Sequence, residues 1–239
     1  MKKFHRHFYT ELPSTQSFLK EWVAFSALPE GTLIWTLYQT AGYGRAGNPW
    51  YATPGESLTL SFLLHPPTEK VPLLTAISAL ALYEAVSPHL HAPLYFKWPN
   101  DLWVFSSNHS GKLAGILAEA IHNGCVIIGI GLNVYQRYFP PELSAISLRQ
   151  AGYSPLTLEE ILDQFEQAFW RWYATHPSKI RADFVKHLYP EIPFRFGDKI
   201  LRAQVEAWDD EGYLHLRAES QLWKIPASQA QVVWNLHSL

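Results

Sequence analysis

Residues 40–50, TAGYGRAGNPW, combine three glycines with one arginine between two apolar, strand-like segments. Glycine lets the backbone adopt positive φ angles and approach a ligand closely. Arg45 adds a planar fork of donors that matches a carboxylate or a phosphate. The segment is therefore a candidate anion-binding loop. Glycine-rich loops also occur as plain connections, so the glycines alone leave both interpretations open.

Three later segments carry polar residues at predicted strand ends: 97–101 (KWPND), 111–117 (GKLAGIL) and 129–134 (GIGLNV). Lys97 and Lys112 are candidate cations for an anionic ligand, and solvated strand ends are the alternative. Asn100 and Asp101 are candidate ligand contacts or the residues of an Asx turn.

Ser14 and Thr15 precede a segment with apolar residues at helical spacing, so a helix is expected to begin there. Their hydroxyls suit N-capping. The alternative is that they bind a polar head group, together with Gln16 and the free N–H groups of the helix start.

The chain has 239 residues, of which 48% are hydrophobic and 17% charged, enough apolar material for a large core. Its formal net charge of -2 provides no basic surface for general nucleic-acid or anionic-membrane binding. No segment reaches the ~18 consecutive apolar residues of a membrane span. The positively charged N-terminus lacks a signal-peptide core.

Cys125 is the single cysteine, which excludes an internal disulfide and favours a reducing, cytoplasmic location. It could be an acyl-transfer nucleophile, but its place at the head of an apolar run favours a small core residue. The eleven histidines show no metal-binding spacing such as His-Glu-x-x-His.

The predicted elements are short strands interspersed irregularly with helices. Strands are expected within 8–14 and at 33–39, 58–64, 94–97, 102–105, 112–120 and 126–133, helices at 14–29, 73–86, 157–172 and 180–189, and a hairpin turn at 108–111. This order predicts an α+β fold with a mixed or antiparallel sheet flanked by helices.

After Pro190 and Pro193 the pattern changes to short strands at 200–207, 213–217 and 232–234, with a hairpin signal at 209–212. We therefore expect one domain over residues 1–190 and a small second domain, a β-barrel, over residues 191–239.

Taken together, residues 14–16, 39–50, 97–101, 111–117 and 129–134 resemble the motifs of the biotin protein ligase family, in the same order. The resemblance implies a class II synthetase-like catalytic domain and an SH3-like C-terminal domain. It implies ATP- and Mg²⁺-dependent activation of biotin to biotinyl-5'-AMP, then transfer of biotin to a lysine of a biotin carboxyl carrier domain. A monomer or a homodimer is expected.

The resemblance assigns the activation step to Arg45, Lys97, Lys112 and Asp101. A carboxylate that approaches a polyphosphate meets a repulsion on the order of 4 kcal/mol per pair of unit charges at ~4 Å and an effective dielectric of ~20. The three cations would offset this repulsion. The aspartate would act through water or Mg²⁺, so no fixed protein metal site is expected.

The resemblance divides the site residues between two ligands. The biotin-binding residues are Ser14, Thr15, Gln16, Gln39, Gly42, Tyr43, Gly44, Arg45, Lys112 and Gly115, and the ATP-binding residues are Trp50, Lys97, Asn100 and Asn133. Trp50 would stack near the adenine, with burial in the core as the alternative.

The loop departs from the family pattern Gly-Arg-Gly-Arg-Arg-Gly-Arg, since Tyr43, Ala46 and Asn48 replace arginines. This lowers the expected affinity for ATP and retention of the adenylate. Gln16 replaces a frequent asparagine with a longer amide. Only 13 residues precede Ser14, too few for the DNA-binding domain of some relatives, so no nucleic-acid partner is expected.

Two rival functions remain. A lipoate or octanoate ligase or transferase would share the fold and the carrier-lysine chemistry, but the arginine-rich, triple-glycine motif of that group is absent. A non-catalytic biotin- or nucleotide-binding sensor would have no need for both Lys97 and Lys112 at the reacting centre.

Overall fold

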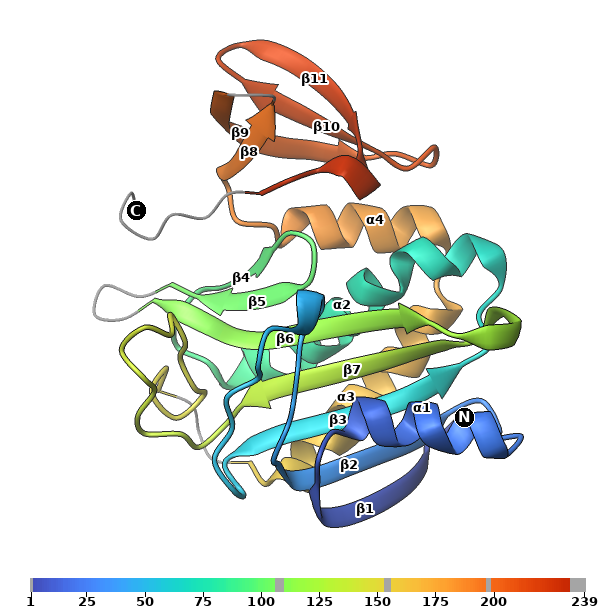
Figure 1. Cartoon of the computed structure of the whole chain (residues 1–239). Coiled ribbons are helices and arrows are strands. Elements are labelled where there is room, and N and C mark those ends of the chain that lie inside the picture. Colours follow the sequence, from blue (N-terminus) through green and yellow to red (C-terminus); the bar gives the residue numbers. More distant parts are fainter. Residues whose placement is uncertain (1, 106–109, 153–155, 197–198, 233–239) are drawn as a thin grey trace.

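The computed structural model describes residues 2–105, 110–152, 156–196 and 199–232, and its centre is a seven-stranded sheet of order β1-β2-β3-β7-β6-β5-β4 (Figure 1). The strands are β1 (His5–Leu12), β2 (Thr32–Gln39), β3 (Ser57–Leu64), β4 (Leu94–Lys97), β5 (Asp101–Val104), β6 (Gly111–Ala120) and β7 (Val126–Asn133). β1 and β2 pair in parallel and the other neighbours pair antiparallel. The predicted α+β fold with a mixed sheet is confirmed.

The central strands supply two hydrophobic clusters, because successive side chains of a strand point to opposite faces. Phe62 and Ile128 pack on the rear face with the helices α2 (Leu74–Val86) and α3 (Leu158–Ala174). Leu63 and Ile127 pack on the front face against Leu19 of α1 (Thr15–Phe25). In Figure 1, α1 covers only part of the front face, while α2 and α3 lie behind the sheet.

The segment Thr68–His89, which contains α2, is long and apolar enough to cross a membrane by length and composition alone. α2 contacts both the sheet and α3, and its side chains Ile77 and Leu80 are buried in the main cluster. It is a core helix, as its apolar character all round predicts.

An irregularity between β5 and β6 turns a lysine toward the front face. The pairing shifts by one residue between Leu102 and Trp103, so that Leu113 of β6 is skipped. A regular strand would place Lys112 and Gly115, three residues apart, on opposite faces. Instead a Cβ built on Gly115 would lie 3.0 Å from Lys112 Nζ, so both share the front face.

A second, four-stranded antiparallel sheet follows, with the order β11-β10-β9-β8 and the strands β8 (Ile192–Phe196), β9 (Lys199–Trp208), β10 (Tyr213–Ala218) and β11 (Gln221–Pro226). It lies against α4 (Pro177–Lys186), where Trp208 packs edge-on against Trp98 and Phe184 (Figure 1). β11 was not predicted. Its turn is formed by Glu219 and Ser220, both at positive φ, and lacks the glycine that marks such turns.

Some predicted boundaries were wrong. α1 ends at Phe25, since Ser26 is already extended, and α4 begins at Pro177, a residue that suits the first helical turn. Of the predicted hairpin at 108–111, residues 108 and 109 lie outside the described chain. Of the predicted strand at 232–234, Val232 forms a bridge to Phe194 and the rest lies outside. The domain boundary near residue 191 stays a prediction.

Candidate active site

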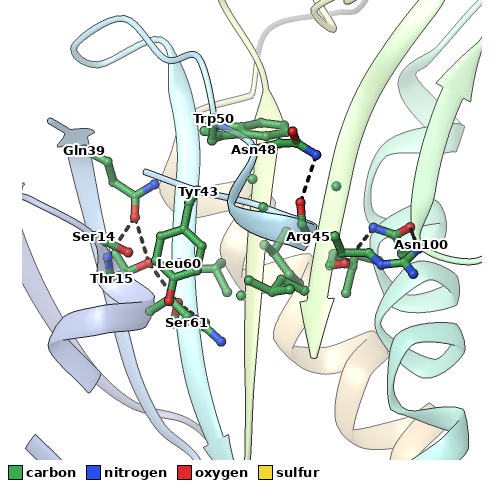
Figure 2. A pocket seen from close by; sticks show the side chains of 18 of the residues that line it. Ser14, Thr15, Gln39, Tyr43, Arg45, Asn48, Trp50, Leu60, Ser61 and Asn100 are labelled. Carbon is green, nitrogen blue, oxygen red and sulfur yellow. Dashed lines mark hydrogen bonds between the residues drawn. The ribbon is translucent and has the colours of Figure 1, made fainter. Parts of the chain in front are cut away.

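A cavity of about 290 Å³ lies on the front face, between the start of α1, the loop 40–50 and strands β3, β6 and β7 (Figure 2). It brings together segments that are far apart in the sequence. The predicted site residues that line it are Ser14, Thr15, Gln16, Gln39, Tyr43, Gly44, Arg45, Trp50, Asn100, Asp101, Lys112 and Gly115.

One end of the cavity, the polar end, is a set of hydrogen bonds among uncharged side chains. Thr15 donates its backbone N–H to Gln39 Oε1 (2.7 Å), and its hydroxyl lies 2.8 Å from Ser61 Oγ. Ser61 donates to Gln16 Oε1 (2.9 Å). Thr15, Gln16 and Ser61 are buried. Ser14 both caps α1 with its side chain and lines the cavity, so its two predicted roles are compatible.

The bonding of the two glutamines fixes which atom each turns toward a ligand. Gln39 Oε1 is occupied by Thr15, which leaves the amide nitrogen of Gln39 as a donor. Gln16 Nε2 donates to Glu119 Oε2 (2.8 Å) and to the carbonyl of Ile127 (3.3 Å), so its acceptor oxygen points to Ser61. The polar end therefore offers a donor and an acceptor to a neutral polar group.

The opposite end, the cationic end, carries charge. Lys112 Nζ lies 2.8 Å from Asp101 Oδ1. Arg45 Nη1 donates to Asn100 Oδ1 (3.1 Å), and Asn100 donates to the carbonyl of Ile116 (3.0 Å) (Figure 2). With two cations and one carboxylate, this end attracts an anion.

Glycines form the floor of the cavity. Gly131 of β7 pairs with Gly115 of β6, and Gly129 lies two residues along β7, about 7 Å away. A Cβ on Gly131 would lie 2.4 Å from Trp50 Cε2, and one on Gly129 would lie 2.6 Å from Gln16 Oε1. The Trp50 ring therefore lies directly on the backbone at the cationic end, and the Gln16 amide does so at the polar end.

Nine residues that line the cavity were not assigned to the site from the sequence, and Gly129, Gly131 and Ser61 are among them. The two glycines alternate with apolar residues in an otherwise apolar strand, a pattern that indicates close approach of a ligand or side chain. Ser61 gave no such signal, because one serine in a buried strand has no distinctive spacing.

Lys97 lines an adjoining cavity of about 310 Å³, which shares Trp50, Asp101 and Lys112 with the first. Burial lowers the pKa of Lys97 to about 8; the carboxylate of Asp101 opposes this shift and the ammonium of Lys112 adds to it. A lysine with this pKa holds its charge at neutral pH and loses it in mild alkali.

Asn133 also lines the adjoining cavity. Its Nδ2 donates to the carbonyls of Lys112 (3.2 Å) and Ile146 (3.3 Å), and its Oδ1 accepts from Gln136 (3.2 Å). Its amide therefore fixes the backbone that carries Lys112, and contacts to a nucleotide remain a prediction.

The loop 40–50 is held by its own backbone. The N–H of Gly44 donates to the carbonyl of Asn48 (2.8 Å), and that of Trp50 donates to Gly42 (2.9 Å). Gly42 does not line the cavity in the described chain, but a Cβ there would lie 2.6 Å from Gln39 Nε2, so glycine is needed for the amide to lie against it.

Comparison with known proteins places this chain in a family. The sequence model of the biotin/lipoate A/B protein ligase family matches residues 8–133, more than half of the chain. The bifunctional ligase/repressor BirA of Bacillus subtilis is 31% identical over 242 residues, which cover 95% of this chain and 74% of that protein. The chain belongs to the biotin protein ligase family. A biotin–[acetyl-CoA-carboxylase] ligase of Mycobacterium tuberculosis is 32% identical over 181 residues, which cover 72% of this chain and 66% of that protein.

Solved structures show that the fold is that of biotin protein ligases. The biotin protein ligase of Aquifex aeolicus in complex with biotin and ATP superposes with a TM-score of 0.76 at 24% identity, covering 96% of this chain and 99% of that one. A biotin protein ligase-like protein of unknown function from Silicibacter superposes with a TM-score of 0.69 at 10% identity. The match covers 94% of this chain and 95% of that one. Similarity of fold alone therefore does not establish the reaction.

Proposed function

We propose that the protein activates biotin with ATP to biotinyl-5'-AMP and transfers biotin to a lysine of a biotin carboxyl carrier domain. The observation that carries this proposal is the division of one cavity into a neutral polar end at Gly129 and a cationic end at Gly115 and Gly131. Biotin has the same division, with a cyclic urea at one end and a carboxylate at the other.

In the first step, a carboxylate oxygen of biotin attacks the α-phosphorus of ATP and pyrophosphate leaves. Arg45, Lys112 and Lys97 reduce the repulsion between the two anions and stabilise the charge that moves to the leaving group. Lys112 is the cation closest to the reacting carboxylate, since it lies over Gly115 between the two cavities.

In the second step, the neutral amine of the carrier lysine attacks the acyl carbon, AMP leaves with the electrons of the acyl–oxygen bond, and the nitrogen releases one proton to solvent as the amide forms. This step needs no nucleophile from the protein. Cys125 is buried in the front-face cluster, in agreement with its predicted place in the core. Positioning of the two reactants supplies the acceleration.

ATP would occupy the adjoining cavity, with Trp50 near the adenine and Lys97 at the phosphates. Mg²⁺ typically keeps several waters and binds one or two carboxylates plus phosphates. The described residues contain no cluster of three or more His, Cys, Asp or Glu side chains that could hold a metal by themselves. Asp101 fits such an ion as a single carboxylate, and the ion would supply further positive charge to the phosphates.

The rival acyl groups of the family lack a polar head. Lipoate and octanoate could form no hydrogen bond with the amide nitrogen of Gln39 or the amide oxygen of Gln16, and they would keep water from both groups, which disfavours their binding. The carrier protein follows from the proposed reaction, and the formal net charge of -2 gives no basic surface that would favour nucleic acid or an anionic membrane as partner. The single cysteine favours a reducing, cytoplasmic location.

Mass detection of the acyl-adenylate tests the proposal. The protein is mixed with Mg-ATP and biotin, lipoic acid or octanoic acid, beside a Lys112→Ala variant. Biotinyl-AMP alone is expected, at a level that falls sharply in the variant. Biotin binding without any adenylate would contradict the ligase and support the sensor.

A further inference from the structure

Two charged residues that do not line the cavity form a cluster behind its polar end. Lys20 of α1 and Glu119 of β6 form an ion pair with 2.7 Å between Nζ and Oε1. Glu119 Oε2 also accepts from Gln16 Nε2 (2.8 Å) and from the Tyr43 hydroxyl (3.4 Å). Lys20 Nζ donates to the same hydroxyl (3.2 Å). The pair therefore touches two residues of the cavity wall.

Those two wall residues, Gln16 and Tyr43, are positions where this chain departs from the family pattern: a longer amide for asparagine and a tyrosine for arginine. Lys20 lies one helical turn after Gln16, on the same face of α1. Both departures contact one ion pair, so they form a single local arrangement, in which Lys20 brings from the helix the positive charge that the loop lacks.

Glu119 determines how Gln16 is oriented. An ionised carboxylate only accepts hydrogen bonds, so it can bind only the NH₂ side of the amide. This directs Gln16 Oε1 toward Ser61 and the cavity. Lys20 neutralises the partly buried carboxylate, and its bonds to Glu119 and Tyr43 outweigh the effect of burial and raise the pKa of Lys20. The carbonyl of Ile127 favours the same orientation through a longer bond to Gln16 Nε2 (3.3 Å), so the 2.8 Å bond to Glu119 supplies most of the preference.

We infer that Lys20 and Glu119 are positioning residues for the head group of the substrate: they hold the amide of Gln16 so that its oxygen can accept from an N–H group of a neutral cyclic urea. The inference rests on the proposed function. It places specificity for the head group partly outside the cavity wall, in a pair separated by 99 positions in the sequence.

The test measures adenylate formation by Glu119→Gln and Lys20→Met variants, with biotin and ATP varied separately. A glutamine at 119 can donate as well as accept, so only the longer bond to the Ile127 carbonyl still favours this orientation of the Gln16 amide. The KM for biotin should rise about 30-fold in Glu119→Gln and about tenfold in Lys20→Met. The KM for ATP and kcat at saturating biotin should stay unchanged, because the reacting carboxylate lies at the other end of the cavity.

Two further variants separate positioning from folding. Lys20→Met/Tyr43→Arg returns the cation to the loop and should recover most of the biotin affinity lost in Lys20→Met. Lys179→Met removes an exposed ion pair on α4, with Asp183 at 2.5 Å, and should change neither KM. Equal KM values for biotin in the wild type and both single variants, or a fall in kcat with unchanged KM for biotin, would overturn the inference. Absence of biotinyl-AMP with the wild type itself would overturn the proposed function.

Discussion

The polar and cationic ends of the cavity differ in how far their geometry is fixed. At the polar end, Thr15 and Gln16 are 2% and 3% exposed and are held by several hydrogen bonds. At the cationic end, the Lys112 side chain is 31% exposed and Arg45 is exposed. The end proposed to recognise biotin is thus ordered in the absence of a ligand, whereas the more exposed cations at the other end remain free to adjust to the phosphates that we propose they bind.

The largest expected effect comes from removing the central cation. Lys112→Ala should lower the rate of adenylate formation about 10³-fold, because about 4 kcal/mol of repulsion between carboxylate and phosphate is no longer offset. Quench-flow measurement at saturating substrates checks this. Lys112→Arg should retain more activity than the alanine variant, and equal rates in all three proteins would remove Lys112 from the reaction.

A methyl group added at Gly131, in the glycine floor of the cavity, should disturb the cationic end and leave the polar end unchanged. Gly131→Ala places a Cβ 2.4 Å from Trp50 Cε2, so the ring must move, and adenylate formation should fall about 100-fold. Tryptophan fluorescence should shift as well. In a Trp50→Ala background the same change should have almost no further effect, because the clashing ring is gone. If the losses from the two substitutions add, Gly131→Ala does not act by displacing the Trp50 ring.

A change at the polar end should affect binding rather than rate. Thr15→Val removes the hydroxyl between Gln39 and Ser61 and should raise the KM for biotin about tenfold, with kcat retained. Thr32→Val is a matched control, since Thr32 is also buried and its hydroxyl donates to the backbone carbonyl of Pro29, away from the cavity lining. A fall in kcat for Thr15→Val would weaken the division of the cavity into two roles.

The smallest effect is a pH dependence from Lys97. Its pKa of about 8 predicts that kcat/KM for ATP, which reports the free enzyme, falls several-fold as the pH rises through about 8. Lys97→Arg should flatten this alkaline limb, because arginine stays charged. If kcat/KM for ATP still falls in the same way above pH 8 in that variant, the fall belongs to the titration of another group.

The same lysine gives a stability prediction with a definite sign. An unfolded lysine keeps its proton to about pH 10.5, whereas folded Lys97 releases it near pH 8. The unfolded chain therefore binds more protons between these values, and the contribution of Lys97 to the free energy of unfolding should rise with pH across this window. Urea titrations of the wild type and Lys97→Met at pH 7 and pH 9.5 measure this contribution. The free energy of unfolding of the wild type, relative to that of the variant, should be larger at pH 9.5 than at pH 7.

The sequence predicted the central sheet well, because β2, β3 and β7 are apolar runs bounded by clear loops. The resemblance to the motifs of the biotin protein ligase family predicted somewhat more than half of the residues that line the cavity. The sequence could not predict the skipped Leu113, which decides the direction of Lys112, since a bulge leaves no periodic signal. Nor could it predict the Lys20–Glu119 pair, because a charge on a solvated helix face looks the same whether or not a distant strand supplies its partner.

The orientation of the ligand is the central claim, and a crystal structure of the protein with biotin tests it most directly. The account predicts the cyclic urea within hydrogen-bond distance of Thr15 and Gln16 over Gly129, and the carboxylate beside Lys112 over Gly115. A reversed ligand, with its carboxylate at Gln16, or biotin bound outside this cavity would contradict the account.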